Sequence, residues 1–251
     1  MSLKSYEKFI DTTIKDAQSK FSTAIQSYIN LVIGRANGPT EEFINPVQAQ
    51  NTANDLLEQA GYTAATLEFL NNDYGRAVNQ SSDLLKSRFG GTYRFSDDSL
   101  LILDSIKNTD LLQFNQISQD LANRIGRAFS DLSRGLLDKD TFIAQVTQQS
   151  ELVDNRYIKT QVDTAFSGFN REANQRLATD AGFTEFRYVG PLDSITRDFC
   201  RNVLEGKYGE PVKTLDEWNE LNDVPERKGQ PNPVSVFQGG YNCRHNLVAV
   251  R

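Results

Sequence analysis

The chain has 251 residues, a formal net charge of −6 and 38% hydrophobic residues, which is enough for a sizeable core. The acidic balance argues against broad electrostatic binding to nucleic acid, and a lack of long apolar runs argues against a transmembrane helix. Two cysteines form no disulfide framework. Because the N-terminus shows no apolar signal core, we expect the protein to remain in the cytoplasm where it is made.

The first part of the chain shows the periodicity of amphipathic helices. Apolar residues from Ile10 to Leu31 are spaced alternately four and three apart, which predicts a long helix with a heptad stripe. Gly34 and Asn37–Pro39 are expected to end it. The stripe packs either on its own domain or on a neighbouring subunit, so self-association through this helix is one expectation.

Further helices are predicted up to Gly182. Asn45 and Pro46 have the character of a cap and a first helical residue. Apolar spacing then predicts the following helical ranges: 56–70 (one or two helices), 76–89, 100–106, 114–136, 141–149 and 153–181.

The composition changes after Gly182, where most of the seven prolines lie. Alternation predicts a strand at 183–189. The stretches 234–237 and 247–250 are also expected to be strands, and short helices are expected at 196–204 and 214–218. The sequence therefore predicts an α+β protein with two parts: a mostly helical domain (1–181) that makes assembly or partner contacts, and a small α+β module (182–251).

The two cysteines and the single histidine lie in this module. Cys243 and His245 are two apart and would share one face of a strand, and Cys200 could add a third ligand from a helix. Thiolate with imidazole suits zinc, with Asp193, Asp198 or water as the fourth ligand. Two alternatives remain open: a reduced buried pair with His245 bonded to backbone, and a Cys200–Cys243 disulfide.

Charged and hydroxyl side chains flank these three residues. Buried arginines must be paired, and acidic residues lie close by, so the group is either an internal salt-bridge network or a binding site for an anion or a partner carboxylate. The predicted structural cluster contains Asp193, Thr196, Arg197, Cys200, Cys243, Arg244 and His245.

Several enzyme classes find no support in the sequence. A His-Asn-His nuclease needs more than one histidine, and neither a G-x-S-x-G nor a P-loop motif is present. A Cys–His nucleophile pair stays open. We therefore expect no enzymatic activity, no catalytic residues and no cofactor apart from a possible zinc ion.

Two motifs carry a resemblance to a known family. The pattern D-x-x-T-R-x-x-C at Asp193–Cys200, followed by Gly206, and N-C-R-H at Asn242–His245, followed by the apolar stretch 247–250, resembles the C-terminal module of phage head-morphogenesis proteins. These are minor head proteins similar to the F protein of phage Mu. A Gly-Leu-Leu turn at 135–137 and the helix through Thr160, Phe166 and Arg171 extend the likeness to residues 115–251. The family often has C-x-x-C and C-R-C in these motifs, whereas Val203 and His245 stand here.

The resemblance implies a structural protein of the virion, in the head near the portal, that acts in head assembly or DNA packaging. Its partners would be portal, major capsid or scaffold proteins, with neither membrane nor specific nucleic-acid binding. Two alternatives are a head–tail connector ring protein and a Cys/His- or metal-dependent enzyme carried in the virion.

Overall fold

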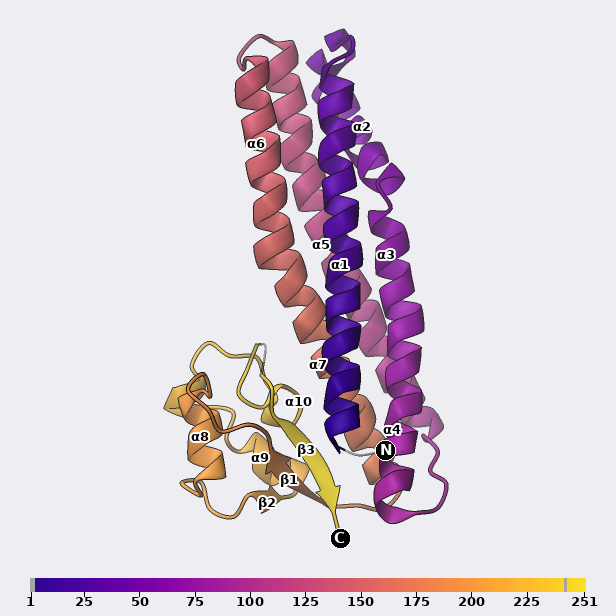
Figure 1. The fold of residues 1–251 in the computed structure, drawn as a ribbon, viewed down its shortest axis with the longest axis vertical. Helices are drawn as coiled ribbons and strands as arrows, with labels where there is room; N and C mark the ends of the chain where they lie inside the picture. The colour runs from indigo at the N-terminus through magenta and orange to yellow at the C-terminus, as the bar shows by residue number, and fades with distance from the viewer. Residues whose placement is uncertain (1–2, 242) are drawn as a thin grey trace. The chain divides into compact units, whose positions relative to one another are not determined.

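The computed structural model describes residues 3–241 and 243–251 and shows a mostly helical α+β protein, as predicted (Figure 1). The α-helices are α1 (Leu3–Ala36), α2 (Pro46–Gln59), α3 (Tyr62–Glu68), α4 (Tyr74–Phe89), α5 (Asp97–Ser133), α6 (Lys139–Leu152), α7 (Lys159–Asp180), α8 (Asp198–Leu204), α9 (Leu215–Asn219) and α10 (Val234–Phe237). Short 3-10 or π segments are η1 (Glu41–Ile44), η2 (Phe69–Asp73), η3 (Val153–Ile158) and η4 (Pro225–Arg227). The strands are β1 (Glu185–Val189), β2 (Val212–Lys213) and β3 (Asn246–Val250). None of the helices in the described ranges has both the length and the apolar character needed to cross a membrane.

The chain forms two compact units. The sheet-containing unit comprises the N-terminal residues through Ile10, residues 74–107 and residues 163–251, and the helical unit comprises residues 11–73 and 108–162. The change from helix to strand lies where the sequence indicated it, between the end of α7 and the start of β1. The unit that holds the sheet also includes helical residues that precede this point.

Aromatic side chains form the core of the helical unit. Phe21 of α1 is fully buried. Its ring stacks on that of Phe114 from α5 at 5.1 Å between centroids, and it meets the rings of Tyr62 and Phe69 edge-on at 5.4 and 6.2 Å. Phe21 belongs to the predicted heptad stripe, whose members from Ile10 to Tyr28 are all buried. The periodicity therefore identified the inner face of α1, and self-association through this helix stays a prediction.

The predicted helix boundaries agree with the structure at several points. The Asn45 side chain accepts a hydrogen bond from the Val47 N–H at 2.9 Å and caps α2. Two ranges predicted as separate helices, 100–106 and most of 114–136, belong to the single helix α5. The long helix predicted from Val153 begins with the π segment η3 before α7 continues it.

The three strands form an antiparallel sheet in the order β2–β1–β3. In β1, Phe186 and Tyr188 are buried while Glu185 and Arg187 are exposed, which confirms the predicted alternation. Trp218 of α9, also fully buried, donates a hydrogen bond from Nε1 to the Phe186 carbonyl at 3.0 Å. The sheet thus has one face packed on the core of its unit.

The prediction of a strand at 234–237 was wrong, because these residues form the one-turn helix α10. The N–H groups of Val234 and Ser235 donate to the side chains of Asn222 (2.8 Å) and Asn219 (2.9 Å). Side chains distant in sequence thus satisfy the first N–H groups of the turn, and this tertiary contact overrides the β-propensity of the valines.

Candidate functional site

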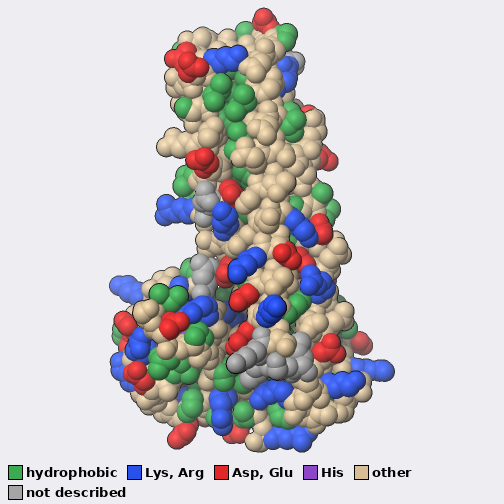
Figure 2. Space-filling view, in the orientation of Figure 1, with side chains coloured by type: hydrophobic (Ala, Val, Ile, Leu, Met, Phe, Trp, Pro, Cys, Tyr) green, Lys and Arg blue, Asp and Glu red, His purple; other side chains and the backbone are tan. Residues whose placement is uncertain are grey.

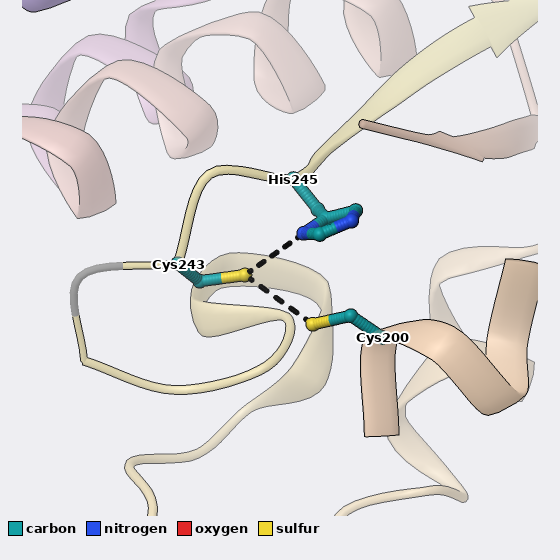
Figure 3. A group of neighbouring side chains, drawn as sticks. All are labelled: Cys200, Cys243 and His245. Atoms are coloured by element: carbon teal, nitrogen blue, oxygen red, sulfur yellow. Dashed lines mark hydrogen bonds between the residues drawn. The ribbon is translucent and has the colours of Figure 1, made fainter. Parts of the chain in front are cut away.

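The two cysteines and the histidine converge in the sheet-containing unit (Figure 3). Cys200 lies on α8, and Cys243 and His245 lie in the segment directly before β3. The strand geometry expected for this pair was wrong, since the segment has no regular structure. The side chains of Cys243 and His245 nevertheless point toward each other, as the prediction required.

The potential ligand atoms of these residues are close together. The Cys243 Sγ lies 3.7 Å from the Cys200 Sγ and 3.7 Å from the His245 Nδ1, and all three atoms lie within 4.8 Å of one another. All three residues are buried, with 1%, 7% and 2% of Cys200, Cys243 and His245 exposed. Both thiols are free. We call this group the Cys–Cys–His cluster.

Two glycines permit the backbone to pass close to the cluster. A Cβ atom on Gly239 would lie 2.2 Å from the Cys200 Sγ and 3.2 Å from the Cys243 Sγ. A Cβ atom on Gly190 would lie 2.2 Å from the His245 Cδ2. Each position therefore requires the absence of a side chain, which gives a structural reason for the Gly239–Gly240 turn seen in the sequence.

Hydrogen bonds from neighbouring groups surround the cluster. The Tyr188 hydroxyl donates to the Cys200 Sγ at 3.2 Å, and the Gly239 N–H donates to the Cys243 Sγ at 3.3 Å. The His245 Nε2 lies 2.9 Å from the Pro191 carbonyl oxygen, and its ring stacks on that of Tyr188 at 5.3 Å. Because a carbonyl only accepts, the Nε2 atom carries the proton. The other ring nitrogen, Nδ1, faces the Cys243 sulfur at 3.7 Å.

The contact between the two thiols separates their pKa values. The hydrogen bond from Cys200 lowers the pKa of Cys243 against the opposing effect of burial, with further lowering by His245 and the charge of Arg171. The same contact, together with burial, raises the pKa of Cys200. Within the pair, Cys243 is therefore the more acidic thiol.

The charged half of the predicted cluster is exposed, contrary to the expectation of buried arginines. Arg244 forms a bidentate ion pair with Asp193 at 2.7 and 2.8 Å, with 42% and 41% of the two side chains exposed. This pair holds the pKa of Asp193 well below its usual value. Arg197, also exposed, donates to the Gly239 carbonyl at 2.8 Å, and the Thr196 hydroxyl accepts from the Asp193 N–H at 2.9 Å.

The structure therefore brings the seven predicted residues into two adjoining groups. Arg197 links them, because it binds the backbone of Gly239, which packs on both sulfurs. Neither Asp193 nor Asp198 belongs to the potential metal-binding group found among the described residues, so the expectation of a carboxylate as fourth ligand finds no support. Asn242 of the N-C-R-H motif lies outside the described residues.

Sequence reasoning missed the buried arginines that organise this region. Arg171 of α7 is 6% exposed and donates to the Cys243 carbonyl, the Asn246 Oδ1 (3.3 Å) and the Val236 carbonyl (3.5 Å). Arg227 is 2% exposed and donates to the Gln238 carbonyl at 2.7 Å. Both arginines bind mainly backbone oxygens, a pairing that leaves no charge signature in the sequence.

The arrangement can bind a soft metal ion or hold two thiols and an imidazole in a fixed, buried geometry. A substrate would need access to a sulfur or a ring nitrogen, and burial restricts that access. Comparison of the chain with protein-family models, with curated protein sequences and with solved structures finds no match in any of the three.

Proposed function

We propose that this chain is a minor head protein of a phage virion, near the portal, that acts through protein–protein contacts in head assembly or DNA packaging. One observation carries the proposal. The two motifs behind the family resemblance, 193–200 and 242–245, are about forty residues apart, and their described side chains come together in one place. Such convergence is expected if the motifs specify one folded module.

The contacts that Asp193 and His245 make within the module support a structural role. Asp193 is engaged by Arg244 and accepts a hydrogen bond from the Ile195 N–H. His245 faces Pro191 with one ring nitrogen and Cys243 with the other. A catalytic nucleophile must also be reachable by its substrate, whereas Cys200, Cys243 and His245 are buried.

Exposed apolar side chains offer surfaces for partner proteins. Leu101 and Leu112 of α5 are each 69% exposed, and Ile195, inside the first motif, is 73% exposed. On the face shown in Figure 2, lysines and arginines are interspersed with acidic residues. Together with the net charge of −6, this suits contacts with portal, capsid or scaffold proteins better than contacts with DNA.

The proposal is tested in particles of a phage that encodes the chain. Quantitative mass spectrometry of gradient-purified full heads should find the chain in a small, constant number of copies, and gold labelling should place it near the portal vertex. Deletion of its gene should reduce the yield of DNA-filled heads. Absence of the chain from purified particles, with normal head yield after deletion, would contradict the proposal.

The copy number per particle distinguishes a minor head protein from a head–tail connector ring protein. A closed ring at the neck would require the copy number of the ring's rotational symmetry, with density outside the portal. A minor head protein is instead expected at a copy number that is not fixed by the neck symmetry.

A further inference from the structure

We propose that Cys200, Cys243 and His245 bind one zinc ion through Sγ, Sγ and Nδ1, with the fourth position left for a water molecule. This inference goes beyond the proposed function, because it concerns how the C-terminal module is held together and applies whatever the chain does in a particle.

The distances between the three atoms match the edges of a zinc tetrahedron. With zinc–sulfur bonds of about 2.3 Å and zinc–nitrogen bonds of about 2.0 Å, a tetrahedral site requires about 3.8 Å between two sulfurs and about 3.5 Å between sulfur and nitrogen. The structure has 3.7 Å for Cys200 Sγ to Cys243 Sγ and 3.7 Å for Cys243 Sγ to His245 Nδ1. The third edge is at most 4.8 Å, against a tetrahedral value of about 3.5 Å.

The surrounding hydrogen bonds are those that metal ligands need. A histidine that binds zinc through one nitrogen donates its other N–H to a carbonyl or carboxylate, which fixes the ring. The His245 Nε2 meets the Pro191 carbonyl at 2.9 Å and leaves Nδ1 facing the sulfurs. The Gly239 N–H and the Tyr188 hydroxyl donate to the two sulfurs, which stabilises negative charge on each of them.

The cost of leaving the cluster without a metal also favours this inference. Without a metal, the contacts among the three side chains are a thiol–thiol and a thiol–imidazole contact of 3.7 Å each, and thiols are weak donors and acceptors. The glycines at 190 and 239 show that the backbone is shaped closely around them. Zinc would join α8 to the segment before β3, two parts of the module more than forty positions apart.

The test begins with the full chain, purified from cells under reducing conditions without chelator. Elemental analysis should find about one zinc per chain. Replacement by cobalt should produce the intense visible bands of a tetrahedral site and a near-ultraviolet thiolate-to-cobalt band. Less than about 0.2 zinc per chain together with two titratable thiols in denaturant would overturn the proposal in favour of a reduced pair. No titratable thiol would overturn it in favour of a disulfide.

Variants separate binding from folding. His245→Asn and Cys243→Ser should lose the zinc, whereas Arg244→Gln, which alters only the exposed ion pair next to the site, should keep about one zinc per chain. Because a ligand variant can fail to fold, a second measurement uses the wild-type chain. Removal of zinc by a chelator should lower the Tm by at least about 5 °C, and added zinc but not magnesium should restore it. An unchanged Tm would contradict a structural zinc.

Discussion

The core of the helical unit and the Cys–Cys–His cluster of the sheet-containing unit are held together in different ways. Around Phe21, rings from α1, α3, η2 and α5 exclude water over a large apolar area. Around Cys200, sulfur, imidazole and backbone groups make specific contacts at fixed distances. The stability of the first region should fall when side-chain volume is removed. The stability of the second should depend on small changes in atomic position, charge or metal content.

The largest effect is expected from Phe21→Ala in the helical unit. Removing a fully buried ring that contacts three other aromatic rings should lower the free energy of unfolding by about 3–5 kcal/mol. Urea denaturation followed by circular dichroism measures this. Leu112→Ala, at a site 69% exposed on α5, should change stability by less than about 0.5 kcal/mol. Equal losses in both variants would show that Phe21 is no core residue.

Replacing glycine by alanine should cost more stability beside the Cys–Cys–His cluster than at an open site on a helix. In Gly239→Ala the new Cβ would lie 2.2 Å from the Cys200 Sγ, so the backbone or the sulfurs must move, at a cost of about 3 kcal/mol. In the control Gly75→Ala, on α4, the Cβ meets no atom within 4 Å. That helix should gain about 0.5–1 kcal/mol from the replacement. A Gly239→Ala chain as stable as the control would refute the close packing at the cluster.

Loss of a buried donor should have an intermediate effect. Arg171→Leu leaves the carbonyls of Cys243 and Val236 without their donor inside the core, which should cost about 2 kcal/mol. The exposed arginine change Arg244→Gln should cost less than about 1 kcal/mol. Thermal unfolding of both variants provides the comparison. A larger loss of stability in Arg244→Gln than in Arg171→Leu would mean that the surface ion pair, and not Arg171, stabilises the segment that contains Cys243.

The smallest effect concerns pH. The Arg244 guanidinium lowers the pKa of Asp193 in the folded chain, so the stabilising contribution of this carboxylate is present above its unfolded pKa of about 4 and is lost as the pH falls below it. The difference in urea midpoint between wild type and Asp193→Asn should therefore shrink from pH 7 to pH 3. Glu210→Gln, which removes an exposed carboxylate of the same unit, serves as the control. A difference that grows at low pH would contradict this assignment.

The two regions also differ in how far the sequence predicts them. Local periodicity identified the buried face of α1, and a capping residue placed the start of α2, because these signals act within a few residues. The grouping of Cys200, Cys243 and His245 followed from their scarcity. The sequence could not indicate that Arg171 binds the Cys243 carbonyl, or that two asparagines cap α10. Those contacts depend on tertiary structure alone.

We propose that the Cys–Cys–His cluster stabilises the fold of a head protein. The most direct measurement is the amount of the chain in purified heads when Cys243→Ser replaces the wild type. We predict a marked loss of incorporated chain and of DNA-filled heads, because the module without its cluster is less stable and is degraded before assembly. Normal incorporation into intact, DNA-filled heads would contradict the account.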